Sequence, residues 1–419
     1  MERPDPPNSS YSWVIVAVST LALLLSNGLS IGGLPPFYKP IREEFVALGA
    51  VEPASAESFI ANAANITFLM SGVFSLLGGW LAMWVRLKAL MVIGCILLAV
   101  GLVLHSQAIN VETVYAARLL MGASLGFVGV APNVVLVSRW FDTGRGTALG
   151  ILLTGTSLGG AVIPLIAAPL IANYGWRPAM LWVSSLVWLV LLPAIIFLIK
   201  EPGTGLADEI RPEHGGSTLR AALSRPIFWL LATCAALVFY PIFATSQQFI
   251  LYLQTPKIGV SPEMAALAQS ALFAISIGGK FLAGFLSDRF RPVAVMTFFA
   301  LLMFAASLVL FALTAGTALF FLLPFALGYG GTFVLLQRLA ADLFGRREAS
   351  KILGAITMVE VIGAAIGGRI TGYLADQAGG DYTYAFYGVT VAAGLAFAAT
   401  IAVYVLTRNS NSEKKTSVV

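Results

Sequence analysis

Two ionisable side chains, Lys280 and Glu360, stand inside long apolar stretches where a charge is costly. Lys280 lies in the run SIGGKFLAGFLSD, eight residues before Asp288, a separation of about 12 Å along a helix. A charge in such a run normally faces a partner or a water-filled cavity rather than lipid. Because a buried lysine can hold an anion and a buried glutamate can carry a proton, this pair of residue types suits the joint binding of an anion and a proton.

Each residue also has a structural interpretation. Lys280 could be a snorkelling lysine whose long stem reaches the lipid headgroups. Glu360 could be a structural partner of Lys280, or an acid kept neutral by burial. We hypothesise that the two side chains pair in the empty protein, and that a protonated Glu360 releases Lys280 to an arriving carboxylate.

The other arginines in apolar stretches are expected to be structural. Arg369 is nine residues from Glu360 and therefore on the opposite side of a helix, so we expect it to pair with Asp376, which shares its side, or to snorkel outward. Arg338, at an inner helix end, is expected to snorkel. Arg118 is expected to play a structural part.

Further polar and aromatic side chains in the apolar stretches are predicted to line a cavity. Tyr329 and Phe333 are one helical turn apart near the middle of their stretch. Since Asn, Gln and aromatic residues in membrane helices often only join helices, we expect only part of this set to touch a ligand. The predicted substrate-binding residues are Lys280, Tyr329, Phe333, Asn27, Asn133, Tyr240 and Gln247, and the predicted proton-coupling residues are Glu360 and Lys280.

The elements that must position these residues are membrane helices. Of the 419 residues, 58% are hydrophobic and 11% are charged, whereas soluble domains carry about 25% charged residues. A helix needs about 20 apolar residues to cross a bilayer. Such runs, which do not alternate as barrel strands do, are centred near residues 25, 70, 98, 125, 160, 189, 238, 275, 303, 329, 364 and 395. The first run, 13–37, is too long for the core of a cleavable signal peptide.

The distribution of Lys and Arg predicts the orientation. With a cytoplasmic N-terminus, most of the 25 Lys and Arg residues fall in inner segments, so both termini are expected in the cytoplasm. A long polar stretch separates six helices from six. The predicted organisation is a six-helix bundle at 1–199, a cytoplasmic linker at 200–225, and a six-helix bundle with a cytoplasmic tail at 226–419.

Glycine pairs repeat at corresponding places in the two halves. SLLGG ends at Gly79, SLGG at Gly160, SIGG at Gly279 and AIGG at Gly368. Such pairs alone indicate only close helix packing, but four at matching positions favour inverted repeats of three helices. We therefore expect an all-α membrane protein with twelve transmembrane helices in two six-helix bundles built from inverted three-helix repeats.

Several motifs resemble those of the major facilitator superfamily. GFLSDR (284–289) resembles the G-x-L-x-D-R signature that follows helix 8, and RLLMG (118–122) resembles the R-x-x-x-G of helix 4. The stretch 360–384 is similar to the helix 11 signature of the bacterial monocarboxylate porters. RWFDTGRGTALGI (139–151) is similar to a loop of those porters and of oxalate/formate exchangers.

This resemblance implies a transporter in a bacterial inner membrane whose partners are a small-molecule carboxylate, a proton and the lipid bilayer, and we expect a monomer. In these porters an arginine eight residues before the loop acid holds the substrate carboxylate, and the matching residue here is Lys280. Lysine is a point charge without the bidentate fork of arginine. Animal members also use a helix 1 lysine and a helix 8 acid for proton coupling, which this sequence lacks, so that pair is not carried over.

Two classes of function fit a membrane protein of this kind, a transporter and a membrane-embedded or lipid-modifying enzyme. The histidines are His105 and His214, and Cys95 and Cys234 lie in separate apolar runs. Since there is no nucleotide-binding motif or metal spacing, we expect no enzyme activity, no cofactor, no metal and no nucleic-acid partner.

We expect a secondary active transporter of a small organic anion, with a monocarboxylate and proton symport favoured, working by alternating access. One alternative is a proton-coupled exporter of amphipathic drugs, although GTSLGGAVIP lacks the G-P-x-x-G-G run of antiporters. Another alternative is an anion exchanger for dicarboxylates.

Overall fold

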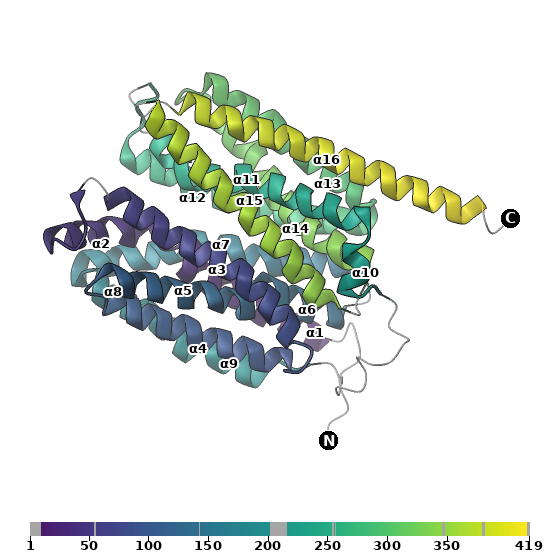
Figure 1. The fold of residues 1–419 in the computed structure, drawn as a ribbon, viewed down its shortest axis with the longest axis horizontal. Coiled ribbons are helices and arrows are strands. Elements are labelled where there is room, and N and C mark those ends of the chain that lie inside the picture. The colour runs from purple at the N-terminus through teal and green to yellow at the C-terminus, as the bar shows by residue number, and fades with distance from the viewer. Residues whose placement is uncertain are drawn as a thin grey trace. The chain divides into compact units, whose positions relative to one another are not determined.

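The computed structural model describes residues 10–53, 56–141, 143–201, 216–253, 255, 257–345, 348–378 and 382–416. These residues form helices joined by short connections, and a single antiparallel bridge links Gly216 and Gly345 (Figure 1). Twelve segments of the described chain are long and apolar enough to cross a membrane. They contain all twelve predicted centres, so the predicted twelve-helix architecture is confirmed.

The helices of the first half include two π-helical segments, η1 and η3. They are α1 (Ser10–Asn27), η1 (Gly28–Gly32), α2 (Pro35–Ala47), α3 (Ala56–Leu81), α4 (Leu87–Ser106), α5 (Val111–Val128), α6 (Val130–Trp140), α7 (Arg145–Tyr174), α8 (Trp176–Leu186), η3 (Val187–Leu191) and α9 (Leu192–Leu198). Three membrane spans of this half are composite, because α1 continues through η1, α5 through α6, and α8 through η3 into α9.

The second half consists mainly of long uninterrupted helices. They are α10 (Leu219–Leu223), α11 (Pro226–Leu253), α12 (Pro262–Arg289), α13 (Pro292–Leu308), the short 3₁₀ segment η4 (Val309–Ala312), α14 (Ala318–Phe344), α15 (Ala349–Gln377) and α16 (Thr383–Thr416). In this half α16 packs against α11 and α13 (Figure 1).

The chain divides into two compact units. The first comprises Met1–His214 with Ala349–Met358, and the second comprises Gly215–Glu348 with Val359–Val419. The first turns of α15 are thus grouped with the first unit. Most of the predicted linker, residues 202–215, lies outside the described residues.

The glycine pairs mark close helix contacts that recur in both units. In the first unit, a methyl group at Gly78 would lie 2.8 Å from the carbonyl oxygen of Gly126, which joins α3 to α5, and one at Gly159 would collide with α1. In the second unit, Gly279 in the same way joins α12 to α14, and Gly367 joins α15 to α11. The same two helix pairings therefore occur in each unit, as inverted repeats require.

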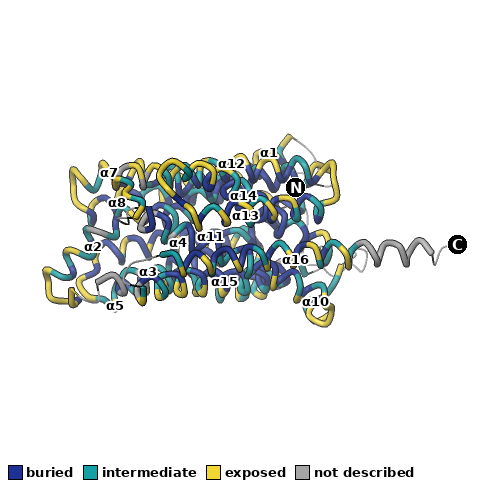
Figure 2. Tube along the Cα trace, turned by 90° about the horizontal axis from the view of Figure 1, so that it is seen from above, coloured by how far each residue is buried: buried dark blue, intermediate teal, exposed yellow. Residues whose placement is uncertain are grey.

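The outward faces of the helices are apolar, as a lipid solvent demands. Leu189, Phe197 and Phe320 are 75%, 77% and 71% exposed. Figure 2 shows buried and exposed positions following one another along the same helices. Buried polar side chains in this setting need a partner or a function, which singles out the residues described next.

Candidate functional site

Lys280 stands where α12 and α14 make their closest approach. A methyl group at Gly330 of α14 would collide with the carbonyl oxygen of Ser276 and would lie 2.8 Å from the backbone nitrogen of Lys280. A methyl group at Gly279 would collide with the backbone of Leu327. The small residues around Lys280 therefore bring the two backbones together and fix the position of its side chain against α14.

The ammonium group of Lys280 lies over two aromatic rings of α14. Its Nζ is 4.8 Å from the ring centroid of Phe333 and 5.4 Å from that of Tyr329. Lys280 is 0% exposed, so its amine does not reach the surface as a snorkelling lysine would. Aromatic faces attract a cation without neutralising it.

Glu360 of α15 is bonded to a residue that the sequence analysis did not single out. Its Oε1 accepts a hydrogen bond from Nε2 of Gln337 over 3.0 Å, and the two residues are 3% and 1% exposed. The hypothesised pairing of Glu360 with Lys280 is thus not the arrangement in this structure, where a neutral amide on the facing helix takes the carboxylate.

A signal for Gln337 was present in the sequence. Tyr329, Phe333 and Gln337 are spaced by four residues and so share one face of α14. Extending the aromatic pair by one turn would have placed Gln337 beside them. The Oε1 atom of Gln337 is buried and has no hydrogen-bond partner within the described chain.

Asn133 supports a break in the fourth membrane span. The span is interrupted at Gly129, between α5 and α6, and Pro132 has no N–H to donate to the carbonyl of Val128. The Nδ2 of Asn133 donates instead to the carbonyl oxygens of Val128 at 2.8 Å and Gly129 at 2.7 Å. The amide nitrogen of this predicted substrate-binding residue is therefore occupied by the backbone, while its buried Oδ1 has no partner in the described residues.

Asn27 also lies at an irregular point, where α1 passes into the π-helical segment η1. Its Nδ2 is buried and has no hydrogen-bond partner among the described residues. Single π-helical turns are frequent at functional sites. In η1, Gly28 and Gly32 pack directly against Gly159 and Gly160 of α7, which holds this turn in place.

The remaining candidates are not gathered around Lys280 by any contact of the described side chains. A methyl group at Gly388 would lie 3.1 Å from the hydroxyl oxygen of Tyr240, so this side chain extends toward α16. The side chain of Gln247 lies outside the described part of the structure. Arg369 is exposed.

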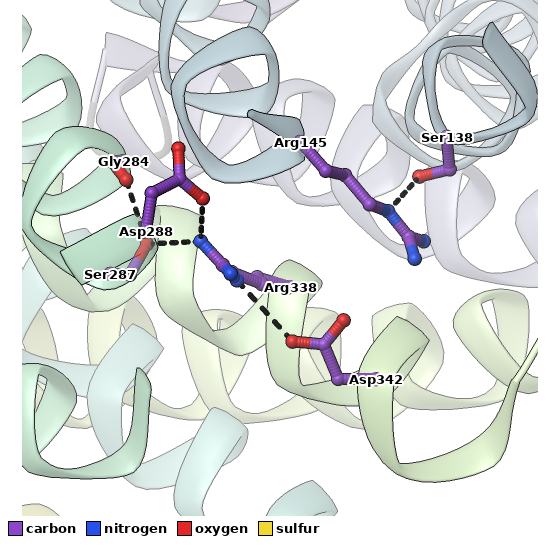
Figure 3. Close-up of polar contacts among 7 residues, drawn as sticks. All are labelled: Ser138, Arg145, Gly284, Ser287, Asp288, Arg338 and Asp342. Atoms are coloured by element: carbon purple, nitrogen blue, oxygen red, sulfur yellow. Dashed lines mark hydrogen bonds and ion pairs between the residues drawn. The ribbon is translucent and has the colours of Figure 1, made fainter. Parts of the chain in front are cut away.

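Arg338 forms a charged cluster at the end of α12. Its Nη1 donates to Oδ1 of Asp288 at 2.6 Å and to Oγ of Ser287 at 2.7 Å, and its Nε donates to Oδ2 of Asp342 at 3.3 Å (Figure 3). The expectation that Arg338 simply snorkels is therefore wrong. Because Asp288 is the acid of the GFLSDR motif, this motif joins α12 to α14. In the first unit, Nε of Arg145 donates to Oγ of Ser138 at 3.0 Å.

The described residues contain no group of three or more His, Cys, Asp or Glu side chains that could hold a metal ion. Lys280 presents a buried ammonium against two aromatic rings, and Glu360 presents a buried carboxyl group with an amide partner.

Comparisons with known proteins agree with this architecture. The family model of the Major Facilitator Superfamily matches residues 19–258 and 249–418. Monocarboxylate transporter 13 of Rattus norvegicus is 26% identical over 390 residues, covering 92% of this chain and 87% of the relative. MFS transporter asaE of Aspergillus flavus is 29% identical over 301 residues, covering 69% and 66%. Among solved structures, the proton:xylose symporter XylE has a TM-score of 0.72 at 14% identity and covers 93% of this chain and 95% of its own.

Proposed function

The chain belongs to the major facilitator superfamily and resembles its monocarboxylate porters, and from this premise we propose that it carries a small monocarboxylate together with a proton by alternating access. It is a multi-pass membrane protein with twelve spans that belongs to a family of transporters. The proposal concerns the substrate class, the coupling ion and the residues that bind them.

The observation that carries the proposal is the burial of Lys280 against Tyr329 and Phe333. A fully buried cation over aromatic faces suits a ligand with one carboxylate and a short apolar body, because the carboxylate meets the ammonium and the apolar part meets the rings. Within the described part of the second unit, Lys280 is the one buried Lys or Arg. This favours a monoanion over a dicarboxylate, and the similarity to monocarboxylate transporter 13 points the same way.

Proton coupling is assigned to Glu360. Its partner Gln337 can donate Nε2 to the carboxylate, and a rotated amide can accept from the protonated acid through the buried Oε1. Glu360 can therefore form a hydrogen bond to Gln337 in both its charged and its protonated form, as a proton carrier requires. Protonation removes a buried negative charge, so a proton and an anion that bind together leave the interior of the protein close to neutral.

The proposed setting follows the sequence analysis. We propose that both termini lie in the cytoplasm, from the bias of Lys and Arg. A bacterial cytoplasmic membrane is proposed from the resemblance of residues 360–384 to the bacterial monocarboxylate porters, and the protein is proposed to be a monomer. The proposed division is an N-terminal bundle at 1–199, a linker at 200–225 and a C-terminal bundle at 226–419.

The test is uptake of radiolabelled lactate and acetate by purified protein in liposomes, with and without an acidic exterior. Lys280→Gln should abolish uptake and Lys280→Arg should retain it, because arginine keeps the charge and adds a bidentate fork. Arg369→Gln is the matched control, since it removes an exposed charge from the same unit. Wild-type uptake by Lys280→Gln would remove Lys280 from the site, and strict oxalate exchange without uptake would favour a dicarboxylate exchanger.

A further inference from the structure

The first unit contains a buried arginine, Arg118, that hydrogen-bonds Tyr38 but has two guanidinium nitrogens without a partner among the described residues. Arg118 lies in α5 and is 1% exposed. Its Nε and Nη1 are buried and have no hydrogen-bond partner in the described part of the chain. A guanidinium carries its charge at every physiological pH and has only donors, so burial without acceptors is unfavourable.

The backbone around Arg118 is fixed by a close contact between α3 and α5. The Thr67 hydroxyl donates to the carbonyl oxygen of Arg118 at 3.3 Å, and a methyl group at Gly122 would collide with the carbonyl oxygen of Thr67. The guanidinium lies over Tyr38, with its Cζ 5.5 Å from the ring centroid. This rigid packing leaves Arg118 little freedom to swing its charge out to the surface.

A second buried polar side chain without partners lies near Arg118. His105, at the end of α4, is 0% exposed, and neither of its ring nitrogens has a hydrogen-bond partner among the described residues. It is close enough to Arg118 and Arg177 for both charges to act on its ring. Its ring centroid lies 6.2 Å from that of Trp176. Buried nitrogens without a hydrogen-bond partner among the described residues thus occur on both Arg118 and His105.

Arg177, in the same region, differs from Arg118 because all three of its guanidinium nitrogens have hydrogen-bond partners. Its Nε and Nη2 donate to Oε1 of Glu44 at 3.0 and 2.8 Å. Its Nη1 donates to the carbonyl oxygen of Ser106 at 2.8 Å, and Nη2 also donates to that of Ala108 at 2.7 Å. Glu44 thus neutralises Arg177, whereas no carboxylate is bonded to Arg118 in the described part of the chain.

We propose that Arg118 is the anchor of a second anion-binding site, contained in the first unit and separate from Lys280. The ligand is a compact monovalent anion, because one net positive charge is available and the neighbouring rings of Tyr38 and Trp176 are apolar. It accepts hydrogen bonds from Nε and Nη1 of Arg118 and from a ring N–H of His105. Chloride and a short carboxylate both have this chemistry, and the experiment separates them.

The experiment measures the thermal unfolding midpoint of the purified full-length protein in detergent. Sodium chloride or sodium acetate replaces a HEPES salt at constant ionic strength. In the Lys280→Gln background, which lacks the proposed carboxylate anchor of the second unit, the midpoint should rise with the anion, whereas that of Lys280→Gln/Arg118→Gln should not respond. Without the anion, Arg118→Gln should unfold at or above the wild-type midpoint, because it removes an unsatisfied buried charge.

Arg177→Gln is the matched control. It breaks bonds that are formed in the structure, so it should lower the midpoint yet keep the rise with anion concentration. A response to chloride alone or to acetate alone identifies the ligand. If Arg118→Gln fails to fold, Arg118→Lys should require at least a tenfold higher anion concentration for the same rise, because lysine lacks the guanidinium donors. In the Lys280→Gln background, an unchanged rise at the same anion concentration in either Arg118 variant, or no rise with Arg118 intact, overturns the proposal.

Discussion

Nε2 of Gln337 and Oε1 of Glu360 are 3.0 Å apart, and this hydrogen bond joins α14 to α15 in the interior of the second unit. Both residues are almost fully buried. The bond puts a neutral group, rather than the Lys280 ammonium, next to the carboxylate. The Lys280 ammonium lies against the aromatic face of α14 instead.

The first prediction concerns Glu360→Gln in the reconstituted protein. Glutamine keeps the shape and can still bond to Gln337, but it cannot take up or release a proton. We expect this variant to exchange labelled lactate across the membrane at a rate close to that of the wild type. We also expect it to lose the acceleration of net uptake by an acidic exterior.

A control for this variant lies one turn away on α15. Thr357→Val removes a buried hydroxyl that has no hydrogen-bond partner in the described residues, and it should leave the response to the pH gradient intact. If Glu360→Gln accumulates lactate with the same pH dependence as the wild type, Glu360 is structural and the proton is carried elsewhere.

The sequence predicts the membrane spans of this structure better than it predicts the contacts between side chains. The twelve spans were predicted correctly because crossing a bilayer needs a long apolar run, a property that composition alone reveals. The position of Lys280 beside Tyr329 and Phe333 was harder to predict from the sequence, because it depends on how α12 and α14 pack. Glycines in both helices made that packing close, and the spacing of the aromatic pair indicated the facing side.

The partners of individual polar groups could not be predicted. Glu360 lies 23 residues from Gln337 in the chain. Whether its carboxylate meets the Gln337 amide or the Lys280 ammonium depends on the rotation of α14 against α15, which the periodicity of the sequence does not specify. Pro132 indicated an irregular helix, but not that Asn133 would bond the carbonyl that the proline leaves free. The role of Asn133 in binding substrate stays a prediction.

The second prediction concerns this bracing of the fourth span. Asn133→Ala leaves the carbonyl of Val128 buried without a donor, so we expect it to lower the free energy of unfolding by about 1–3 kcal/mol. In a Pro132→Ala background the backbone N–H of residue 132 is restored, and the same substitution should cost less. Denaturation of the four proteins of this double-mutant cycle measures the coupling; strictly additive effects would show that the two residues act independently.

The third prediction is a pH dependence of stability at Glu44, which lies outside the membrane spans. Burial raises the pKa of its carboxyl, but hydrogen bonds from Arg177 and Trp176 and the charge of Arg177 outweigh this and lower the pKa overall. The folded protein therefore favours the charged form. The resulting stabilisation is complete above the ordinary glutamate pKa of about 4.3 and is lost as the pH falls through the lower folded pKa.

Thermal unfolding between neutral and acidic pH checks this prediction. The midpoint of the wild type should fall more steeply with acidification than that of Glu44→Gln, which has no carboxyl to protonate. Arg177→Gln should flatten the curve in the same way because it removes the same hydrogen bonds. Parallel curves for the wild type and Glu44→Gln would show that the pair does not contribute to acid sensitivity.

The last prediction uses the two adjacent glycines that precede Lys280. A methyl group at Gly279 would collide with the carbonyl oxygen of Leu327 in α14, whereas one at Gly278 would meet only Cδ2 of Leu327, at 3.9 Å. Gly279→Ala should therefore force α12 away from α14, destabilise the protein by about 1–3 kcal/mol and reduce uptake by displacing Lys280. Gly278→Ala should be neutral or stabilising, since both substitutions gain the same helix propensity, about 1 kcal/mol. The unfolding midpoints and the lactate uptake of the two variants test this prediction. Equal effects of the two substitutions would mean that the glycine pair provides flexibility rather than the close approach of α12 and α14 that positions Lys280.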